Sequence, residues 1–364
     1  MRLLLVGGGH AHAVVLREFA NGPARGATIE TTLVSPSAHQ FYSGMLAGLV
    51  AGRYVRAECE IDVERLALSG GARFVAGSVA GIDLAAHEAI LTDGRRFDYD
   101  LLSLNAGSLP NFSAPGAQRW ATPIKPLEAF LQDWEKMRAA AAARTIRIAV
   151  AGAGTAGVEI AMAMAHALGG RAHVTLYSEK AVFSGAAARR IAAALARAGV
   201  ELRTSAPVTG VEEGPVLIAA GIREPFDYVV WTTGAAALPW LREAGLAVDQ
   251  AGFVLVDDFL RSASHPDVFA AGDSATLRAN PHPKSGVYSV RHGGVLARNL
   301  RRAAAGESLE AYVPQQRSLA LIGTGEGRAI ATYGPWSAEG AWLWRLKDWI
   351  DRRWIGQFAL ERTI

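Results

Sequence analysis

Two glycine-rich turns lie about one domain apart in this chain of 364 residues, and they predict an α/β fold with two Rossmann-like dinucleotide-binding domains. Each turn follows an apolar strand and opens a helix, at residues 3–12 (LLLVGGGHAH) and 148–159 (IAVAGAGTAGVE). A second strand follows in each half, at 30–35 and 173–178. Each half then closes on an apolar strand that ends in glycine, Gly107 in one and Gly234 in the other. The same order of elements in both halves indicates a duplicated architecture.

The second turn carries the complete glycine pattern, Gly152, Gly154 and Gly157. In this pattern the first glycine permits a tight turn, the second lets the backbone approach a pyrophosphate, and the third lets helix and strand pack closely. The anion then meets the amides at the helix N-terminus. The first turn has Gly7 and Gly9 but His12 at the third position, so it is the weaker signal of the two.

The second strand of each half ends in serine, Ser35 and Ser178, where an acidic residue usually binds the ribose hydroxyls. A serine hydroxyl can also bind a ribose. In the second half, Glu179 can serve NADH, whereas Lys180 and the arginines at 189–190 can meet the 2′-phosphate of NADPH. A solvated helix face explains these basic residues at least as well, so both nucleotides stay open.

Charge, hydrophobicity and cysteine content argue against a nucleic-acid-binding, membrane-spanning, secreted or metal-binding protein. The net charge is only +3, and no motif points to nucleic acid. No run of about 18 uncharged apolar residues predicts a membrane span. The first strand is expected to begin at Leu3, so no secretory signal is expected, and a single cysteine fits a cytoplasmic protein. No Cys/His cluster has metal-ligand spacing, so no metal site is expected.

Several further runs carry a resemblance to a known family. Residues 265–273 (HPDVFAAGD), together with the two glycine turns, resemble the two-dinucleotide flavoproteins of the pyridine nucleotide–disulfide oxidoreductase superfamily. Residues 6–12, 39–46 (HQFYSGML) and 344–353 (WRLKDWIDRR) are similar to type II NADH dehydrogenases and to a group found fused to selenide, water dikinase.

The resemblance implies FAD at the first turn and NAD(P)H at the second. Gly7, Gly9, His10 and Ala11 would lie along the FAD pyrophosphate, with His10 and His12 filling the space beside the turn. Gly272 and Asp273 would bind the ribityl and phosphate region. The implied FAD contacts also include Ser35, Ala106 and Gly107; Gly152, Gly154, Gly157, Ser178 and Gly234 would serve NAD(P)H.

The same resemblance implies the domain order. The FAD-binding domain is expected at 1–112 and 251–330, with the NAD(P)H-binding domain inserted at 145–250 and a C-terminal amphipathic extension at 331–364. Residues 71–94 read as a β-meander. Helices are expected at 127–143 and 286–300.

Three residues are candidates for the chemistry. The superfamily places a glutamate near the nicotinamide and flavin, and Glu159 occupies that position. Lys125, in a proline-bounded loop, is expected near the flavin and paired with Glu159. His292 lies on the helix that should begin at the flavin with Gly286 and Val287; an amide-rich N-terminus there stabilises charge on reduced flavin. The alternatives are a surface position in a linker for Lys125 and a structural role on the helix for His292.

The cysteine count limits which electron acceptors are possible. Only Cys59 is present, so a redox dithiol is excluded and reduced flavin must pass electrons directly to an external acceptor, with a quinone favoured. However, the Ala-Gln pair of type II NADH dehydrogenases is absent at 286–287. A selenium compound, a small electron carrier or a regulatory role without catalysis are the alternatives.

The last expected helix combines tryptophans with basic residues, which is typical of a helix lying on a membrane surface. Trp342, Leu346, Trp349 and Ile350 share a face at helical spacing, although Asp348 and Asp351 dilute the basic side. Docking on the flavin domain or on a second subunit, as in a homodimer, is the competing interpretation. Peripheral contact with the inner face of the cell membrane therefore remains one of two expectations.

Overall fold

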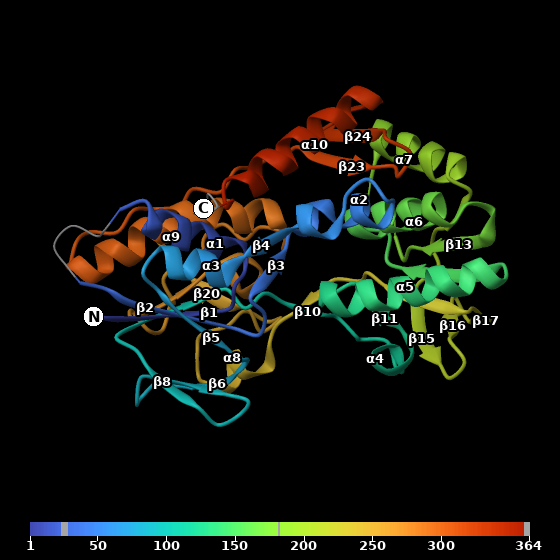
Figure 1. Ribbon diagram of the computed structural model, residues 1–364. Helices are drawn as coiled ribbons and strands as arrows, with labels where there is room; N and C mark the ends of the chain where they lie inside the picture. The colour runs from blue at the N-terminus through green and yellow to red at the C-terminus, as the bar shows by residue number, and fades with distance from the viewer. Residues whose placement is uncertain (23–27, 181–182, 360–364) are drawn as a thin grey trace.

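The computed structural model describes residues 1–22, 28–180 and 183–359, so the end of the expected C-terminal extension, residues 360–364, lies outside the described part. Two lobes stand side by side, and a long C-terminal helix runs across them (Figure 1). Each lobe is built on a five-stranded, all-parallel sheet, and the two sheets have the same plan. The predicted α/β fold with two Rossmann-like domains is confirmed.

The first lobe has the strand order β21-β9-β1-β2-β5. The strands are β1 (Arg2–Val6), β2 (Glu30–Ser35), β5 (Arg73–Ala76), β9 (Leu101–Leu104) and β21 (Val268–Ala270). Helices α1 (His10–Ala20), α3 (Val63–Ser69) and α9 (Gly286–Ala305) pack with this sheet. The runs of leucine and valine are buried on both faces, as expected for a covered parallel sheet.

An antiparallel meander accompanies this sheet, formed by β6 (Val79–Asp83), β7 (Glu88–Leu91) and β8 (Arg96–Asp98). The expected meander at 71–94 is therefore displaced: β5 pairs in parallel with β2 instead. Shorter elements complete the lobe: β3 (His39–Phe41), η1 (Ser43–Met45), η2 (Arg56–Glu58), β4 (Glu60–Asp62), α8 (Pro239–Glu243), β20 (Val254–Val256), η4 (Gly272–Ser274) and β22 (Ala275–Leu277).

The second lobe has the order β11-β18-β12-β13-β14. Its strands are β11 (Thr122–Pro123), β12 (Ile146–Ala151), β13 (Ala172–Tyr177), β14 (Val200–Arg203) and β18 (Tyr228–Trp231). Its helices are α4 (Ala117–Trp120), α5 (Leu127–Ala143), α6 (Thr155–Leu168), η3 (Gly169–Arg171) and α7 (Gly185–Arg197), and its meander is β15 (Val208–Glu212), β16 (Val216–Ala219) and β17 (Ile222–Pro225). Since α4, β11 and α5 belong to this lobe, it begins well before residue 145.

The linkers between the lobes pair with each other. β10 (Leu109–Pro110) leads into the second lobe, β19 (Ala235–Ala236) leads back, and the two form a short antiparallel ladder. Helix α2 (Leu46–Val50) contributes to the same apolar core as α6.

The C-terminal part begins as a sheet. Strands β23 (Ala320–Gly323), β24 (Ala329–Tyr333) and β25 (Trp336–Gly340) form an antiparallel sheet beside α6 and α7, and α10 (Ala341–Gly356) follows. The expected domain boundary at residue 330 therefore falls inside β24. No helix in the described ranges has the length and apolar character needed to span a bilayer.

Candidate functional site

The first glycine turn is organised by Asn105, at the end of β9. Its side-chain oxygen accepts hydrogen bonds from the amides of Ala11 (3.1 Å) and His12 (3.3 Å), and its side-chain nitrogen donates to the Ala271 carbonyl (3.0 Å). Asn105 thus caps α1 and ties the turn after β1 to the turn after β21. Sequence reasoning missed this residue, although an asparagine at the end of a buried strand is a polar group that requires partners.

Close approach to Asn105 explains the glycines of the first lobe. A Cβ on Gly7 would lie 2.5 Å from the Asn105 carbonyl oxygen, and Gly7 also has a φ of +90°. A Cβ on Gly9 would strike the Asn105 side chain, and one on Gly272 would lie 2.5 Å from its amide nitrogen. Two segments expected to contact FAD, the turn after β1 and the turn after β21, therefore converge on Asn105.

His12 replaces the third glycine of the pattern as an internal brace. Its Nδ1 contacts the Gly7 carbonyl at 2.6 Å and its Nε2 contacts the Ser103 hydroxyl at 2.8 Å. A carbonyl only accepts, so Nδ1 carries the proton and Nε2 accepts from the serine. Close helix packing is provided elsewhere: a Cβ on Gly293 of α9 would lie 2.5 Å from that of Val14.

The other predicted residues of the first turn lie around the same sheet edge. The Ala11 amide is already bound by Asn105, and the buried Ser35 hydroxyl donates to the Ser37 carbonyl at 3.0 Å. The Ala106 backbone lies against Gly7, whereas a Cβ on Gly107 would meet open space. These positions fit a group lying along the carboxyl ends of β1, β2 and β9, where open α/β sheets bind ligands.

Asp273 and Lys125 form an ion pair at this edge. Lys125 Nζ lies 2.9 Å from Asp273 Oδ2, which also accepts from the Ser108 hydroxyl at 3.1 Å. Burial raises the pKa of the Asp273 carboxyl, but Lys125 outweighs that effect, and the net shift is below its ordinary value. The expected Lys125–Glu159 pair is therefore wrong: Lys125 reaches the FAD-type turn, and Glu159 has other partners.

The second glycine turn leaves its helix N-terminus open. Gly152 has a φ of +106°, and a Cβ on Gly157 would collide with the Gly152 carbonyl. A Cβ on Gly154 would meet nothing within 4 Å. In the described part of the chain no group accepts a hydrogen bond from the amides of Thr155 and Ala156, which are exposed. This uncapped N-terminus fits a pyrophosphate.

The ribose end of the second site holds no carboxylate on its strand. Ser178 is buried and its hydroxyl donates to the Lys180 carbonyl at 2.6 Å, while Glu179 and Lys180 are exposed. Gly234 follows β18 with open space beside its Cα. Both NADH and NADPH therefore remain candidate donors at this site.

Glu159 belongs to a buried charged cluster that the sequence did not reveal. Its Oε1 accepts from the Gly323 amide at 2.7 Å. Lys347, on α10, donates to Asp351 Oδ2 at 2.9 Å and to the Gly44 carbonyl at 2.7 Å, and Tyr42 donates to Asp351 Oδ1 at 3.1 Å. The cluster therefore joins both lobes to the C-terminal helix.

The charges of this cluster influence one another. Burial raises the pKa of both carboxyls, Glu159 and Asp351, and Lys347 only partly offsets it. Burial opposes the charge on Lys347, yet Glu159 and Asp351 together raise its pKa above the ordinary value. The cluster can thus hold a proton that an exposed carboxylate would release.

Helix α9 begins beside this cluster. A Cβ on Gly286 would lie 3.6 Å from the hydroxyl of Ser43, the neighbour of Gly44, and Val287 is 40% exposed. In contrast, Lys284 turns away: it donates to the Thr276 hydroxyl at 2.8 Å, and burial lowers its pKa to about 8. The flavin contact expected of Gly286 and Val287 stays a prediction.

His292 is buried within the protein. Its Nδ1 accepts from the Gly272 amide at 3.0 Å, and its Nε2 lies 3.1 Å from Nε2 of His282. Burial lowers its pKa to about 3, so the ring is neutral and donates from Nε2 to His282. Both nitrogens are thus committed, and this geometry assigns His292 to positioning the Gly272 turn rather than to contact with a reacting atom.

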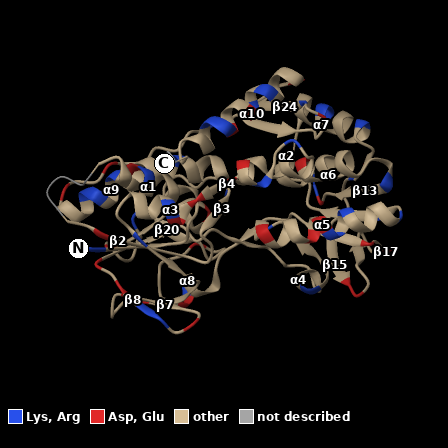
Figure 2. Cartoon of the chain, in the orientation of Figure 1, with Lys and Arg blue, Asp and Glu red and all other residues tan. Residues whose placement is uncertain are grey.

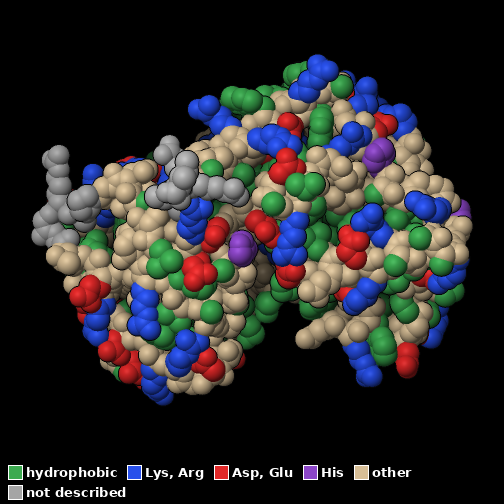
Figure 3. Space-filling model, in the orientation of Figure 1, with side chains coloured by type: hydrophobic (Ala, Val, Ile, Leu, Met, Phe, Trp, Pro, Cys, Tyr) green, Lys and Arg blue, Asp and Glu red, His purple; other side chains and the backbone are tan. Residues whose placement is uncertain are grey.

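Helix α10 presents two different faces. Leu343, Lys347, Asp351 and Trp354 are buried against the lobes, so Asp351 lies on the inner face and not on the basic side as expected. Trp342 and Trp349 are 56% and 57% exposed, and Ile350 shares that outer face. Lysine and arginine positions recur along the α10 ribbon (Figure 2), and Figure 3 shows basic and hydrophobic side chains together on this ridge.

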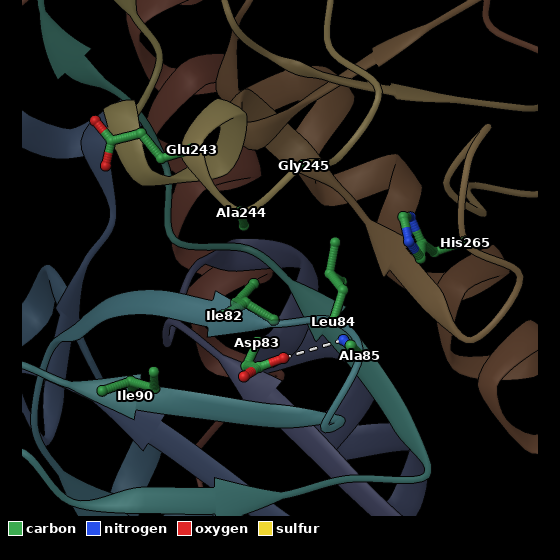
Figure 4. A pocket seen from close by; sticks show the side chains of 9 residues that line it. All are labelled: Ile82, Asp83, Leu84, Ala85, Ile90, Glu243, Ala244, Gly245 and His265. Atoms are coloured by element: carbon green, nitrogen blue, oxygen red, sulfur yellow. Dashed lines mark hydrogen bonds between the residues drawn. The ribbon is translucent and has the colours of Figure 1, made fainter.

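A shallow surface cavity of about 610 Å³ lies elsewhere, between the β6–β7 hairpin and the end of α8 (Figure 4). No fingerprint glycine lines it, and the Asp83 carboxylate is already bound by the amides of Ala85 and Ala86. It therefore takes no part in the site. Within the described residues, no group of three or more metal-ligating side chains is arranged to hold a metal ion.

The model of the pyridine nucleotide-disulphide oxidoreductase family matches residues 1–293. The chain belongs to this family. This confirms three predictions: the superfamily, an oxidoreductase activity, and FAD and NAD(P)H as cofactors. The NADH dehydrogenase-like protein Rv1812c of Mycobacterium tuberculosis is 29% identical over 257 residues, which cover 66% of this chain and 64% of that relative. The match thus spans less than two thirds of the relative's length.

Two solved structures share the fold over almost the whole chain. The sulfide:quinone oxidoreductase of Aquifex aeolicus superposes with a TM-score of 0.83 at 16% identity, covering 98% of this chain and 91% of that one. NDH2 of Plasmodium falciparum, in complex with NADH, has a TM-score of 0.79 at 13% identity, covering 98% and 97%. At these identities the likeness establishes the fold.

Proposed function

We propose that this protein is an FAD-dependent NAD(P)H:acceptor oxidoreductase whose acceptor is a quinone-like small molecule. The observation that carries the proposal is the pair of glycine turns at the carboxyl edges of two parallel sheets, in a chain with a single cysteine. When bound, FAD would supply the redox chemistry, as hydride acceptor for NAD(P)H and electron donor to a second substrate. The protein's part is to position the two dinucleotides.

The state of the cysteine supports direct transfer to an external acceptor. Cys59 is buried, and burial, followed by Glu58 and Glu60, raises the pKa of its thiol to about 12. Dithiol chemistry requires a thiolate and a second cysteine. This chain offers neither, so the second half-reaction needs no protein sulfur.

The buried cluster of Glu159, Lys347 and Asp351 favours a quinone over a metal-centred carrier. Reduction of a quinone consumes protons as well as electrons, whereas an iron–sulfur or haem carrier takes electrons alone. Both carboxyls have raised pKa values, and Lys347 donates to the Gly44 carbonyl, whose neighbour Ser43 lies beside Gly286 at the start of α9. Lys347 and the carboxyls can hold protons at that place and deliver them to a reduced acceptor.

The outer face of α10 supports contact with a membrane surface, where quinones dissolve. Trp342 and Trp349 are exposed there, Arg353 lies 5.5 Å above the Trp349 ring, and Arg345 is exposed beside them. Aromatic rings flanked by arginine suit the boundary between lipid headgroups and acyl chains. A second copy of the chain covering this face, as in a homodimer, is the competing account.

The test is an anaerobic titration of the purified flavoprotein with NADH and, separately, NADPH, followed by a soluble quinone. Bleaching of the flavin by one nucleotide identifies the donor, and recovery of the colour on adding quinone supports the acceptor. Bleaching without recovery would exclude quinone and leave a selenium compound or another small carrier to be tried. No bleaching by either nucleotide would refute the proposed dehydrogenase.

A further inference from the structure

His10, the first residue of α1, has a ring nitrogen without a partner. Nε2 is buried and forms no hydrogen bond with any described residue. The Phe41 carbonyl acts on the same ring and favours a proton on it; because Nε2 is without a partner, we assign that proton to Nδ1. Because a carbonyl can only accept, Nδ1 carries the proton and Nε2 presents a lone pair.

Aromatic rings enclose the imidazole on two sides. Tyr42 and Trp354 lie edge-on to it, with ring centroids at 5.6 and 5.3 Å, and they stack on each other at 4.3 Å. Burial lowers the pKa of His10 to about 4, which keeps the ring neutral. A neutral acceptor in an apolar enclosure is destabilising unless a donor reaches it.

The remaining side of His10 faces the region expected to hold FAD. The charged groups that act on its ring are Asp273 and Lys125, which pair with each other at 2.9 Å. His10 therefore lies between the glycine turn after β1 and the Asp273 turn after β21. The first is expected at the pyrophosphate and the second at the ribityl chain.

His12, in the same turn, differs from His10 in its hydrogen-bond partners. His12 is also buried and neutral, yet both of its nitrogens have protein partners, Gly7 and Ser103. A histidine placed only to brace the turn is therefore fully satisfied by the protein. The free Nε2 of His10 calls for a partner that the polypeptide does not supply.

We propose that Nε2 of His10 accepts a hydrogen bond from a hydroxyl of the FAD ribityl chain. A hydroxyl is a donor, and it matches a neutral imidazole that is already protonated on Nδ1. A phosphate oxygen is only an acceptor and would require a charged ring. The inference rests on the proposed FAD site and assigns one of its side-chain contacts.

The test measures FAD affinity of the apoprotein by flavin fluorescence and does not depend on turnover. His10→Phe keeps a ring between Tyr42 and Trp354 but removes Nε2, and we expect FAD to bind about tenfold more weakly. His10→Gln restores an acceptor near the position of Nε2 and should recover most of the affinity. His12→Phe is the matched control: it should lower the melting temperature of the apoprotein, whereas His10→Phe should leave it unchanged or raise it.

FAD analogues that each lack one ribityl hydroxyl identify the donor. With one of them, the parent protein and His10→Phe should bind equally well. Equal binding of FAD itself by the parent and His10→Phe would overturn the proposal. A loss that persists with every analogue would also overturn it and point to a phosphate. Failure of the proposed function would appear separately, as bound flavin that NAD(P)H does not bleach.

Discussion

Replacing Lys347 by methionine is expected to destabilise the folded protein because it removes the cation from a buried cluster. Lys347 and Asp351 are 6% and 4% exposed, and Nζ also binds the Gly44 carbonyl. Methionine fills a similar volume but removes the cation from between Asp351 and Glu159 and the hydrogen-bond donor from the Gly44 carbonyl, leaving Asp351 with Tyr42 and Glu159 with the Gly323 amide. Breaking a buried ion pair from one side costs about 3–5 kcal/mol.

The size of this loss should depend on pH. Without Lys347, the folded-state pKa values of Glu159 and Asp351 rise further above their unfolded values of about 4. Between those values the folded variant binds more protons than the unfolded chain, so its stability falls as pH rises, by about 1.4 kcal/mol per unit and per group. The difference from the parent protein should therefore be larger at pH 8 than at pH 5.

The assay is chemical denaturation of the FAD-saturated protein at both pH values. Lys136→Met is the matched control, since Lys136 pairs with Asp133 at 2.7 Å on an exposed helix face, with the lysine side chain 71% exposed. Its loss should cost at most about 1 kcal/mol. A Lys347→Met variant that is as stable as this control, or whose loss is the same at both pH values, would refute the reasoning.

Three further predictions concern separate features. Gly157→Val should abolish flavin bleaching by NAD(P)H and leave bound FAD, because even a Cβ there collides with Gly152; unchanged bleaching in a titration would contradict this. The pKa of His12 is lowered to about 4 in the folded protein, so the unfolded chain binds more protons between pH 6.5 and pH 4. Denaturation in this range should show that stability decreases as the pH is lowered, by about 1.4 kcal/mol per unit, and His12→Phe should reduce that slope. Trp342→Glu with Trp349→Glu should weaken co-sedimentation with anionic lipid vesicles while turnover with a soluble quinone is unchanged; undiminished sedimentation would remove α10 from the interface.

Local patterns in the sequence predicted most of the fold. Apolar strands followed by glycine predicted the paired sheets, and α5 spans the expected residues, Leu127–Ala143. These features depend on near neighbours in the chain. The domain boundaries expected at 145 and 330 stay predictions. The short strands β11 and β23 were not expected, because they gain their identity from pairing and packing with distant segments.

The polar contacts of the candidate site were mostly beyond the sequence. Lys347 and Asp351 are four residues apart on an amphipathic helix, a spacing that usually indicates a solvent-exposed pair. Which face of that helix is buried depends on the distant residues it packs against, here Tyr42 and Glu159. The partner of Lys125 was missed because Lys125 lies in a loop, and its partner Asp273 is distant in the chain and comes close only in the folded protein.

The path of the chain has a mechanical consequence. Two antiparallel linkers, β10 and β19, form a hinge about which the lobes could rotate as rigid bodies. Lys347 lies away from that hinge and is shared between Gly44, near the first lobe, and Glu159 of the second. Rotation would separate the opposite charges of Lys347 and Glu159 in a medium of low polarity, which costs free energy. The contacts of α10 therefore oppose rotation about the linkers and hold the two nucleotide sites at a constant distance.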